Sequence, residues 1–176
     1  MENHEKHEIE VIDLEDYSKK GICPPIGKRY KVKIEDQYYI FDHHLVSGKE
    51  IVEKRFHSHP ECHSLYIKLA HCDFDKIGLS ETIDLAQKGI EHFVIKPTDV
   101  FTYKLDGESE MTDKKELTPN EILELGGVTP IEDYYIVLKN ADGTEVSYKG
   151  RSTERIKMRC PAMTFVSIFN GEVPVS

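Results

Sequence analysis

Two stretches of the chain share one pattern of polar and apolar residues, and each predicts a short helix with a defined start. The first stretch begins at Ser47 and the second at Thr118, and in both a glutamate followed by apolar residues stands three positions further on. A hydroxyl side chain and a glutamate at this spacing form a capping box, in which each side chain bonds the other residue's backbone N–H group. We therefore predict helices from 48 to about 56 and over 119–125.

The residues on either side of the two helices repeat with the same offset of 71 positions. Two apolar segments of the first copy have counterparts in the second: 30–34 and 101–105, then 65–68 and 136–139. Solenoid units are shorter, at about 20–50 residues, so a repeat of this length indicates complete small domains. The chain is therefore interpreted as an internal duplication, with domains at 28–97 and 98–176.

The pattern within each copy predicts an α+β fold. Residues 30–34 alternate between apolar residues and lysines, which is the period-two pattern of a sheet with one solvent-facing side. Each copy then reads as strand, strand, helix and three further strands, and Asp-Gly pairs mark turns in the second copy. One helix crossing a mixed sheet in this order is typical of the β-grasp, or ubiquitin-like, domain. We predict two such domains in tandem.

Residues 1–27 precede the first domain and are predicted to be a disordered or extended N-terminal segment. The first ten residues are rich in histidine and glutamate and carry almost no apolar side chains. Apolar residues then stand in an acidic setting at Ile12, Leu14 and Tyr17, in a segment too short to fold by itself. We expect this segment to pack on the first domain or to lie on a partner, and these three residues are candidate partner contacts.

The overall composition, with 39% hydrophobic and 31% charged residues, is that of an ordinary globular protein. No apolar run reaches the ~18 residues that span a bilayer, and no signal-peptide core follows Met1. We therefore expect a cytoplasmic protein with no membrane partner. The net charge of −9 disfavours nucleic-acid binding, because an acidic chain repels phosphate backbones.

Basic residues are nonetheless concentrated in one stretch of the second domain: Lys149, Arg151, Arg155, Lys157 and Arg159. A run of this kind is most often a solvated face of the domain. The alternative is a docking surface for an acidic protein partner, and the sequence leaves both interpretations open.

Imidazole and thiol groups, which zinc accepts as ligands, gather after the first helix at His57, His59, Cys62 and His63. The corresponding positions of the second copy carry no comparable set, so the fold itself needs no metal there. We expect polar loop residues rather than a zinc site, and we predict no metal and no cofactor.

The sequence also lacks the motifs that indicate an enzyme. It has no GxSxG sequence, Walker loop, dinucleotide fingerprint or HExxH sequence. We predict no catalytic residue and no enzymatic activity.

Several motifs of the first copy occur together and carry a family resemblance. They are 11–17, 24–34, the helix start Ser47-Gly48-x-Glu50-Ile51, 77–85 and 89–93. Together they resemble the bacterial multiubiquitin-type repeat proteins, over residues 11 to 97, whereas the second copy matches mainly in pattern. The resemblance implies tandem ubiquitin-like domains that occur beside activating-type enzymes, conjugating-type enzymes and deubiquitinase-like peptidases, in systems that defend bacteria against phage.

For function, the resemblance implies a protein modifier that is conjugated to target proteins. A partner enzyme adenylates the C-terminal carboxylate and passes the acyl group to a thiol, so the tail must be slim, and a diglycine usually provides this. Here the tail from Gly171 to Ser176 holds one glycine and no diglycine. Three explanations stay open: the tail is trimmed at Gly171, the carboxylate of Ser176 is used directly, or the protein is a non-covalent interaction module, an adaptor that is never conjugated.

Overall fold

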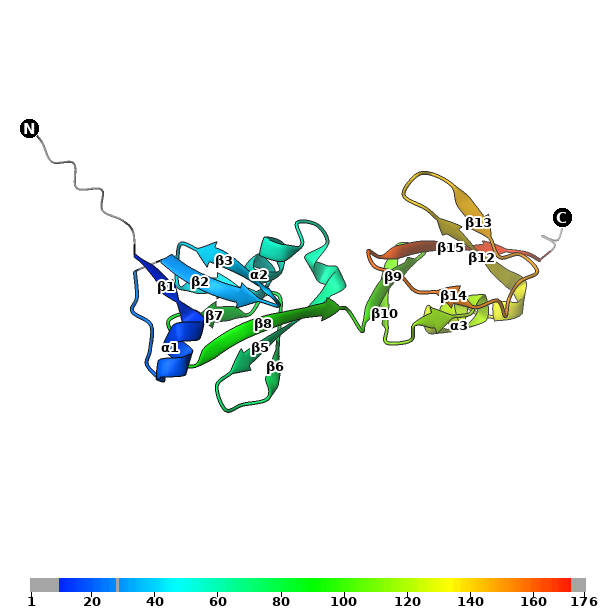
Figure 1. The fold of residues 1–176 in the computed structure, drawn as a ribbon. Helices are drawn as coiled ribbons and strands as arrows, with labels where there is room; N and C mark the ends of the chain where they lie inside the picture. The colour runs from blue at the N-terminus through cyan, green and yellow to red at the C-terminus, as the bar shows by residue number, and fades with distance from the viewer. Residues whose placement is uncertain (1–9, 28, 172–176) are drawn as a thin grey trace, which may run out of the picture. The chain divides into compact units, whose positions relative to one another are not determined.

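The computed structural model describes residues 10–27 and 29–171, and the chain divides into two compact units, Met1–Pro97 and Thr98–Ser176 (Figure 1). Each unit is described by itself. No helix in the described part of the chain is long and apolar enough to cross a membrane.

The described residues of the first unit, 10–27 and 29–97, form a six-stranded sheet, one short strand pair and two α-helices. The main sheet has the order β1-β2-β8-β5-β6 with β3 also paired to β2, and β4 pairs separately with β7. The elements are β1 Val11–Asp13, α1 Leu14–Lys20, β2 Arg29–Ile34, β3 Gln37–Phe41, β4 Leu45–Ser47, α2 Gly48–Arg55, a 3-10 turn Pro60–Cys62, β5 His63–Leu69, β6 Phe74–Ile77, β7 Thr82–Asp84 and β8 Ile90–Pro97.

In the second unit, residues 98–171 are described and form a five-stranded sheet, one short strand pair and one α-helix. The sheet has the order β10-β9-β15-β12-β13, and β11 pairs separately with β14. The elements are β9 Phe101–Leu105, β10 Glu108–Thr112, β11 Glu116–Leu117, α3 Pro119–Leu125, a 3-10 turn Ile131–Asp133, β12 Tyr134–Lys139, β13 Glu145–Ser147, β14 Ile156–Lys157 and β15 Met163–Phe169.

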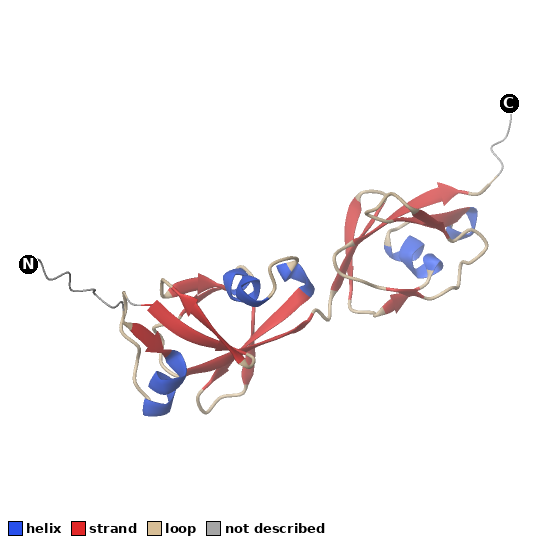
Figure 2. Cartoon of the chain, turned by 45° about the horizontal axis from the view of Figure 1, so that its top comes forward, coloured by secondary structure: helices blue, strands red, loops and turns tan. Residues whose placement is uncertain are grey.

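The two units share one topology. In each, the strand that begins the first hairpin, β2 or β9, lies parallel to the last strand, β8 or β15, at the centre of the sheet. The other pairs among the five strands that the units share are antiparallel. One helix follows the first hairpin in each unit, and Figure 2 shows it against the strands of its own sheet. The predicted α+β fold, two tandem ubiquitin-like β-grasp domains, is confirmed.

Both predicted helices begin where the pattern places them, because each capping box is complete. At α2 the Glu50 N–H donates to Ser47 Oγ at 3.2 Å, and the Ser47 N–H donates to Glu50 Oε2 at 2.7 Å. At α3 Thr118 and Glu121 make the same two bonds, at 3.2 and 2.8 Å. The helices therefore start immediately after the two hydroxyl residues, at the residues that the capping-box pattern predicts.

Each unit has its own hydrophobic core between the helix and the sheet. Ile51 and Val52 of α2, like Ile122 and Leu123 of α3, are no more than 1% exposed. Aromatic side chains of the central strands complete the two cores and are fully buried: Tyr30, Phe93, Tyr103 and Phe165.

The N-terminal segment differs from the prediction of a disordered or extended chain over 1–27. Residues 11–13 form β1, which pairs in parallel with the start of β2, and α1 follows directly. Asp13 caps this helix by accepting the Glu15 N–H at 3.1 Å, and Gly21, with a φ of 66°, ends it.

This segment folds because it buries apolar surface that the strands of the first unit would otherwise leave in water. Ile12 and Leu14 are each 2% exposed and belong to the first core, and Tyr17 packs against that core. Of the two predicted placements, packing on the first domain is the one observed. Disorder is predicted for residues 1–10, of which 1–9 lie outside the described residues.

Candidate functional site

The end of β15 contacts the start of β12 and the 3-10 turn before it. The Asn170 backbone N–H donates to the Asp133 carbonyl at 2.7 Å, and the ring of Phe169 meets that of Tyr134 edge-on, with centroids 5.5 Å apart. Three residues before Asn170, within β15, Ser167 donates its N–H and its hydroxyl to the carboxylate of Asp106, at 2.8 and 2.5 Å. The strand is therefore anchored as far as Asn170.

Gly171 is exposed and is the last described residue of the tail. A Cβ atom at this position would overlap the ring of Phe169, so any larger residue would have to displace that ring. The tail thus leaves the sheet at a residue that has no side chain. Ser176 lies outside the described residues.

The face of the second sheet that points away from α3 carries a small apolar strip. Tyr135 pairs with Ile168 and Val137 with Val166 on neighbouring strands, so these four side chains share one face. Lys149, one residue of the predicted basic cluster, places its ammonium group 5.5 Å from the centre of the Tyr135 ring. A strip of this kind, edged by a cation, is suited to contact with another protein.

The predicted basic cluster does not form one surface. Arg155 and Lys157 line a hollow beside the β11–β14 pair, whereas Arg159 lines a different hollow. Arg151 stacks on Tyr148 and pairs with Glu154. The cluster separates because only Lys157 lies in a strand, which is two residues long, while the other four residues lie in a turn or in irregular segments. Side chains in such segments follow no common direction.

The basic hollow contains two lysines that sequence reasoning missed, Lys114 and Lys115. They lie about 40 positions before Arg155 in the chain, and the antiparallel pairing of Glu116 with Lys157 brings them to it. A strand pair of two residues gives no recognisable sequence pattern. The sequence therefore could not show that Lys114 and Lys115 lie near Arg155 and Lys157.

Two of the four predicted zinc candidates, His59 and His63, make other contacts. His59 Nδ1 lies 3.0 Å from Glu61 Oε1, and the ring of His63 stacks on Phe56 with centroids 4.1 Å apart. His57 is on the hollow beside α2. Within residues 10–27 and 29–171, which include Cys62, no group of three or more histidine, cysteine or acidic side chains is arranged to hold a metal ion.

The predicted partner contacts Ile12, Leu14 and Tyr17 need correction. Ile12 and Leu14 are buried in the first core, so their side chains are not available to a partner, and Tyr17 is partly buried there. The apolar character of the segment does indicate that its side chains are buried, but the surface that buries them is the chain's own sheet.

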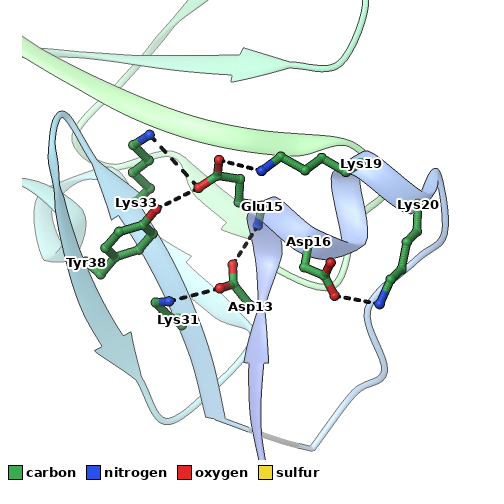
Figure 3. A network of polar contacts seen from close by, with 8 residues as sticks. All are labelled: Asp13, Glu15, Asp16, Lys19, Lys20, Lys31, Lys33 and Tyr38. Atoms are coloured by element: carbon green, nitrogen blue, oxygen red, sulfur yellow. Dashed lines mark hydrogen bonds and ion pairs between the residues drawn. The ribbon is translucent and has the colours of Figure 1, made fainter.

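Polar contacts fasten the same segment from its solvent side (Figure 3). Lys31 Nζ bonds Asp13 Oδ2 at 2.9 Å, and the hydroxyl of Tyr38 donates to Glu15 Oε2 at 2.8 Å. Lys33 Nζ lies 4.0 Å from the same carboxylate oxygen of Glu15. The segment from β1 to α1 is thus joined to β2 and β3 by both apolar and charged groups.

Two of these groups, the Glu15 carboxylate and the Lys31 ammonium group, have their charged forms stabilised by these bonds. Lys19, and after it the Tyr38 hydroxyl, donate to the Glu15 carboxylate and lower its pKa. The bond to Asp13 raises the pKa of Lys31 in turn. The groups are at the surface, so their effect on stability is modest and sensitive to salt.

The fold defines a class of protein: a tandem ubiquitin-like protein. Comparison with known families is more specific for the first unit, since residues 30–98 match the model of the family described as Multiubiquitin. The resemblance recognised in the sequence is thereby confirmed over that range, which runs from β2 to just beyond β8. No curated protein matches the chain.

Proposed function

We propose that this chain is a ubiquitin-like protein modifier of a bacterial ubiquitination-like pathway, activated at its C-terminus and conjugated to target proteins. The two β-grasp units and the Multiubiquitin match support the class of protein. The observation that carries the proposal is the end of the second unit, where β15 is anchored through Asn170 and the chain leaves it at the exposed Gly171.

In this scheme the chain is a substrate of its partners. The tail carboxylate attacks ATP and forms an acyl-adenylate with release of pyrophosphate, and an enzyme thiol then displaces AMP. A target amine finally displaces the thiol, so each attachment joins chain and target with the net loss of one water. The chain supplies a carboxylate on a narrow, extended segment that an enzyme channel can accept.

The anchoring of β15 limits how far the reactive carboxylate can extend from the second unit. If the tail were trimmed at Gly171, one residue would extend beyond the Asn170 anchor, a reach of about 3.5 Å. Residues 171–176 together reach up to about 20 Å when extended. We therefore place the reactive carboxylate beyond Gly171 and propose that trimming at this glycine does not produce the active form.

The partners follow from the family resemblance. They are an activating-type enzyme, a conjugating-type enzyme, a deubiquitinase-like peptidase and the target proteins, and the cellular role is defence against phage. No enzymatic activity is proposed for the chain itself.

A second candidate function is that of an adaptor that binds partners without being conjugated. The observation that favours it is the apolar strip on the open face of the second sheet, where Ile168 is 38% exposed beside Tyr135. An adaptor needs such a face and makes no use of the tail.

Truncation separates the two candidates. In cells that contain the partner enzymes, the full chain should form higher-mass adducts on denaturing gels, and a chain ending at Asn170 should form none while unfolding at an unchanged temperature. A chain ending at Gly171 should also be inactive, and adducts from it would restore the trimming explanation. If the full chain forms no adducts but Ile168→Asp abolishes a stable complex, the adaptor function replaces the modifier.

A further inference from the structure

The β11–β14 pair of the second unit borders an open hollow of about 750 Å³ with a basic lining. Lys114 and Lys115 lead into β11 on one side, and Arg155 and Lys157 stand at β14 on the other. The pairing of Glu116 with Lys157, and of Leu117 with Ile156, fixes the two sides relative to each other. The arrangement belongs to the fold of the unit, since Leu117 and Ile156 are buried in its core.

Two of the four cations form no ion pair with the described residues, although Glu116 lies opposite Lys157 in the strand pair. Lys114 pairs with Glu121 at 2.9 Å and Arg155 with Glu116 at 3.4 Å. No ion pair within residues 10–27 and 29–171 involves Lys115 or Lys157, and both side chains are exposed. The hollow therefore carries an uncompensated positive charge in a chain whose net charge is −9.

We propose that this basic hollow binds an acidic peptide segment of a partner protein, with Lys115 and Lys157 as its ion-pairing residues. Charge complementarity selects acidic side chains, and the two cations stand on opposite sides of one strand pair, so a ligand lying across it meets both. The binding is non-covalent and does not depend on conjugation.

The surroundings of the hollow restrict the ligand to a short segment. A neighbouring hollow shares Lys114 and Glu121 but adds the carboxylates of Asp113 and Glu124, which repel an acidic chain. A long polyanion such as a nucleic acid would cross this acidic surface, whereas a peptide with a few carboxylates would not.

Binding is measured by fluorescence anisotropy with the full chain and a short fluorescein-labelled peptide of glutamate, aspartate and serine. The double variant Lys115→Gln/Lys157→Gln should raise the Kd roughly tenfold, because it removes two surface ion pairs. The double variant Lys88→Gln/Lys104→Gln makes the same charge change at exposed positions outside the hollow and should leave the Kd within roughly twofold. Circular dichroism should show that both variants remain folded.

Three results would overturn the proposal. The first is equal weakening by the two double variants, which would show attraction by overall charge alone. The second is no preference for the acidic peptide over a peptide of glutamine, asparagine and serine. The third is tighter binding of a single-stranded oligonucleotide of equal charge, which would make the hollow a nucleic-acid site.

Discussion

Lys114 donates to Glu121, the carboxylate that closes the capping box of α3, at 2.9 Å. Seventy-one positions earlier, His43 Nε2 lies 3.2 Å from Glu50, the corresponding carboxylate of α2. Each unit thus places a basic residue, seven positions before the capping glutamate, where it can bond it. The two units therefore share the position of a basic side chain beside the capping glutamate, but the side chain is an imidazole in the first unit and an ammonium group in the second.

The caps are expected to contribute measurably to the stability of each unit. Thr118→Ala removes the acceptor for the Glu121 N–H and should lower the free energy of unfolding of the second unit by about 1 kcal/mol. Ser47→Ala should do the same for the first unit. Urea unfolding followed by NMR resolves the two units, and Ser58→Ala, at an exposed loop position, serves as the control with a change below about 0.5 kcal/mol. A Thr118→Ala protein as stable as the control would contradict this role.

Gly48 is expected to be intolerant of substitution, although it is the first residue of a helix. A Cβ atom there would overlap the backbone oxygen of Gly78, in the loop whose Glu81 carbonyl accepts the Gly48 N–H at 2.9 Å. Gly48→Ala should therefore destabilise the first unit by about 1–3 kcal/mol. Gly78→Ala is the matched control, because its nearest neighbour would be 3.7 Å away. Equal thermal unfolding of the two variants would show that the loop simply moves.

Acid is expected to destabilise both units. The Ser47 N–H, ahead of the Ser47 hydroxyl, lowers the pKa of Glu50, and Lys114, ahead of the Thr118 N–H, lowers the pKa of Glu121. Because the folded-state pKa is below the unfolded one, this stabilisation is fully present above about pH 4.5 and is lost as the pH falls through the folded pKa. Glu121→Gln should flatten the fall in unfolding free energy of the second unit below about pH 4.5. If the unfolding free energy of the second unit fell equally with pH in wild type and variant, Glu121 would be excluded as a cause of the acid destabilisation.

The N-terminal segment is expected to be part of the first domain's stability. Leu14→Ala deletes a side chain that is 2% exposed and should cost about 2–5 kcal/mol, whereas Val11→Ala, at 42% exposure in the adjoining strand, should change little. Urea unfolding and limited proteolysis after Lys19 and Lys20 measure the effect. A Leu14→Ala protein as stable as Val11→Ala would mean that the segment is not a cooperative part of the unit.

The elements that the sequence predicted well are those with a signal that acts locally. A capping box involves residues three positions apart, and the alternation of Val32 and Ile34 with lysines is visible in five residues, so the helices and central strands could be placed. The repeat of this pattern then yielded the two-domain architecture.

What the sequence could not supply depends on contacts between distant residues. The strand pairs β4–β7 and β11–β14 are two or three residues long, too short to show an alternation. For the same reason the sequence did not predict that Lys115 and Lys157 line one hollow. It also left undecided whether Ile12 and Leu14 pack on the chain's own sheet or on a partner. Burial could be predicted from their apolar character, but the surface that buries them could not.

The central claim, that the chain is conjugated to target proteins, is tested most directly by the intact mass of the untagged protein from its native host. The mass is compared between cells that contain the activating-type and conjugating-type enzymes and cells that lack them. We predict masses equal to the chain plus a target protein less one water when the enzymes are present, and a free form that retains residues beyond Gly171. A single adduct-free mass under both conditions would contradict the modifier function, and adducts formed through a chain ending at Gly171 would contradict the position that we assign to the reactive carboxylate.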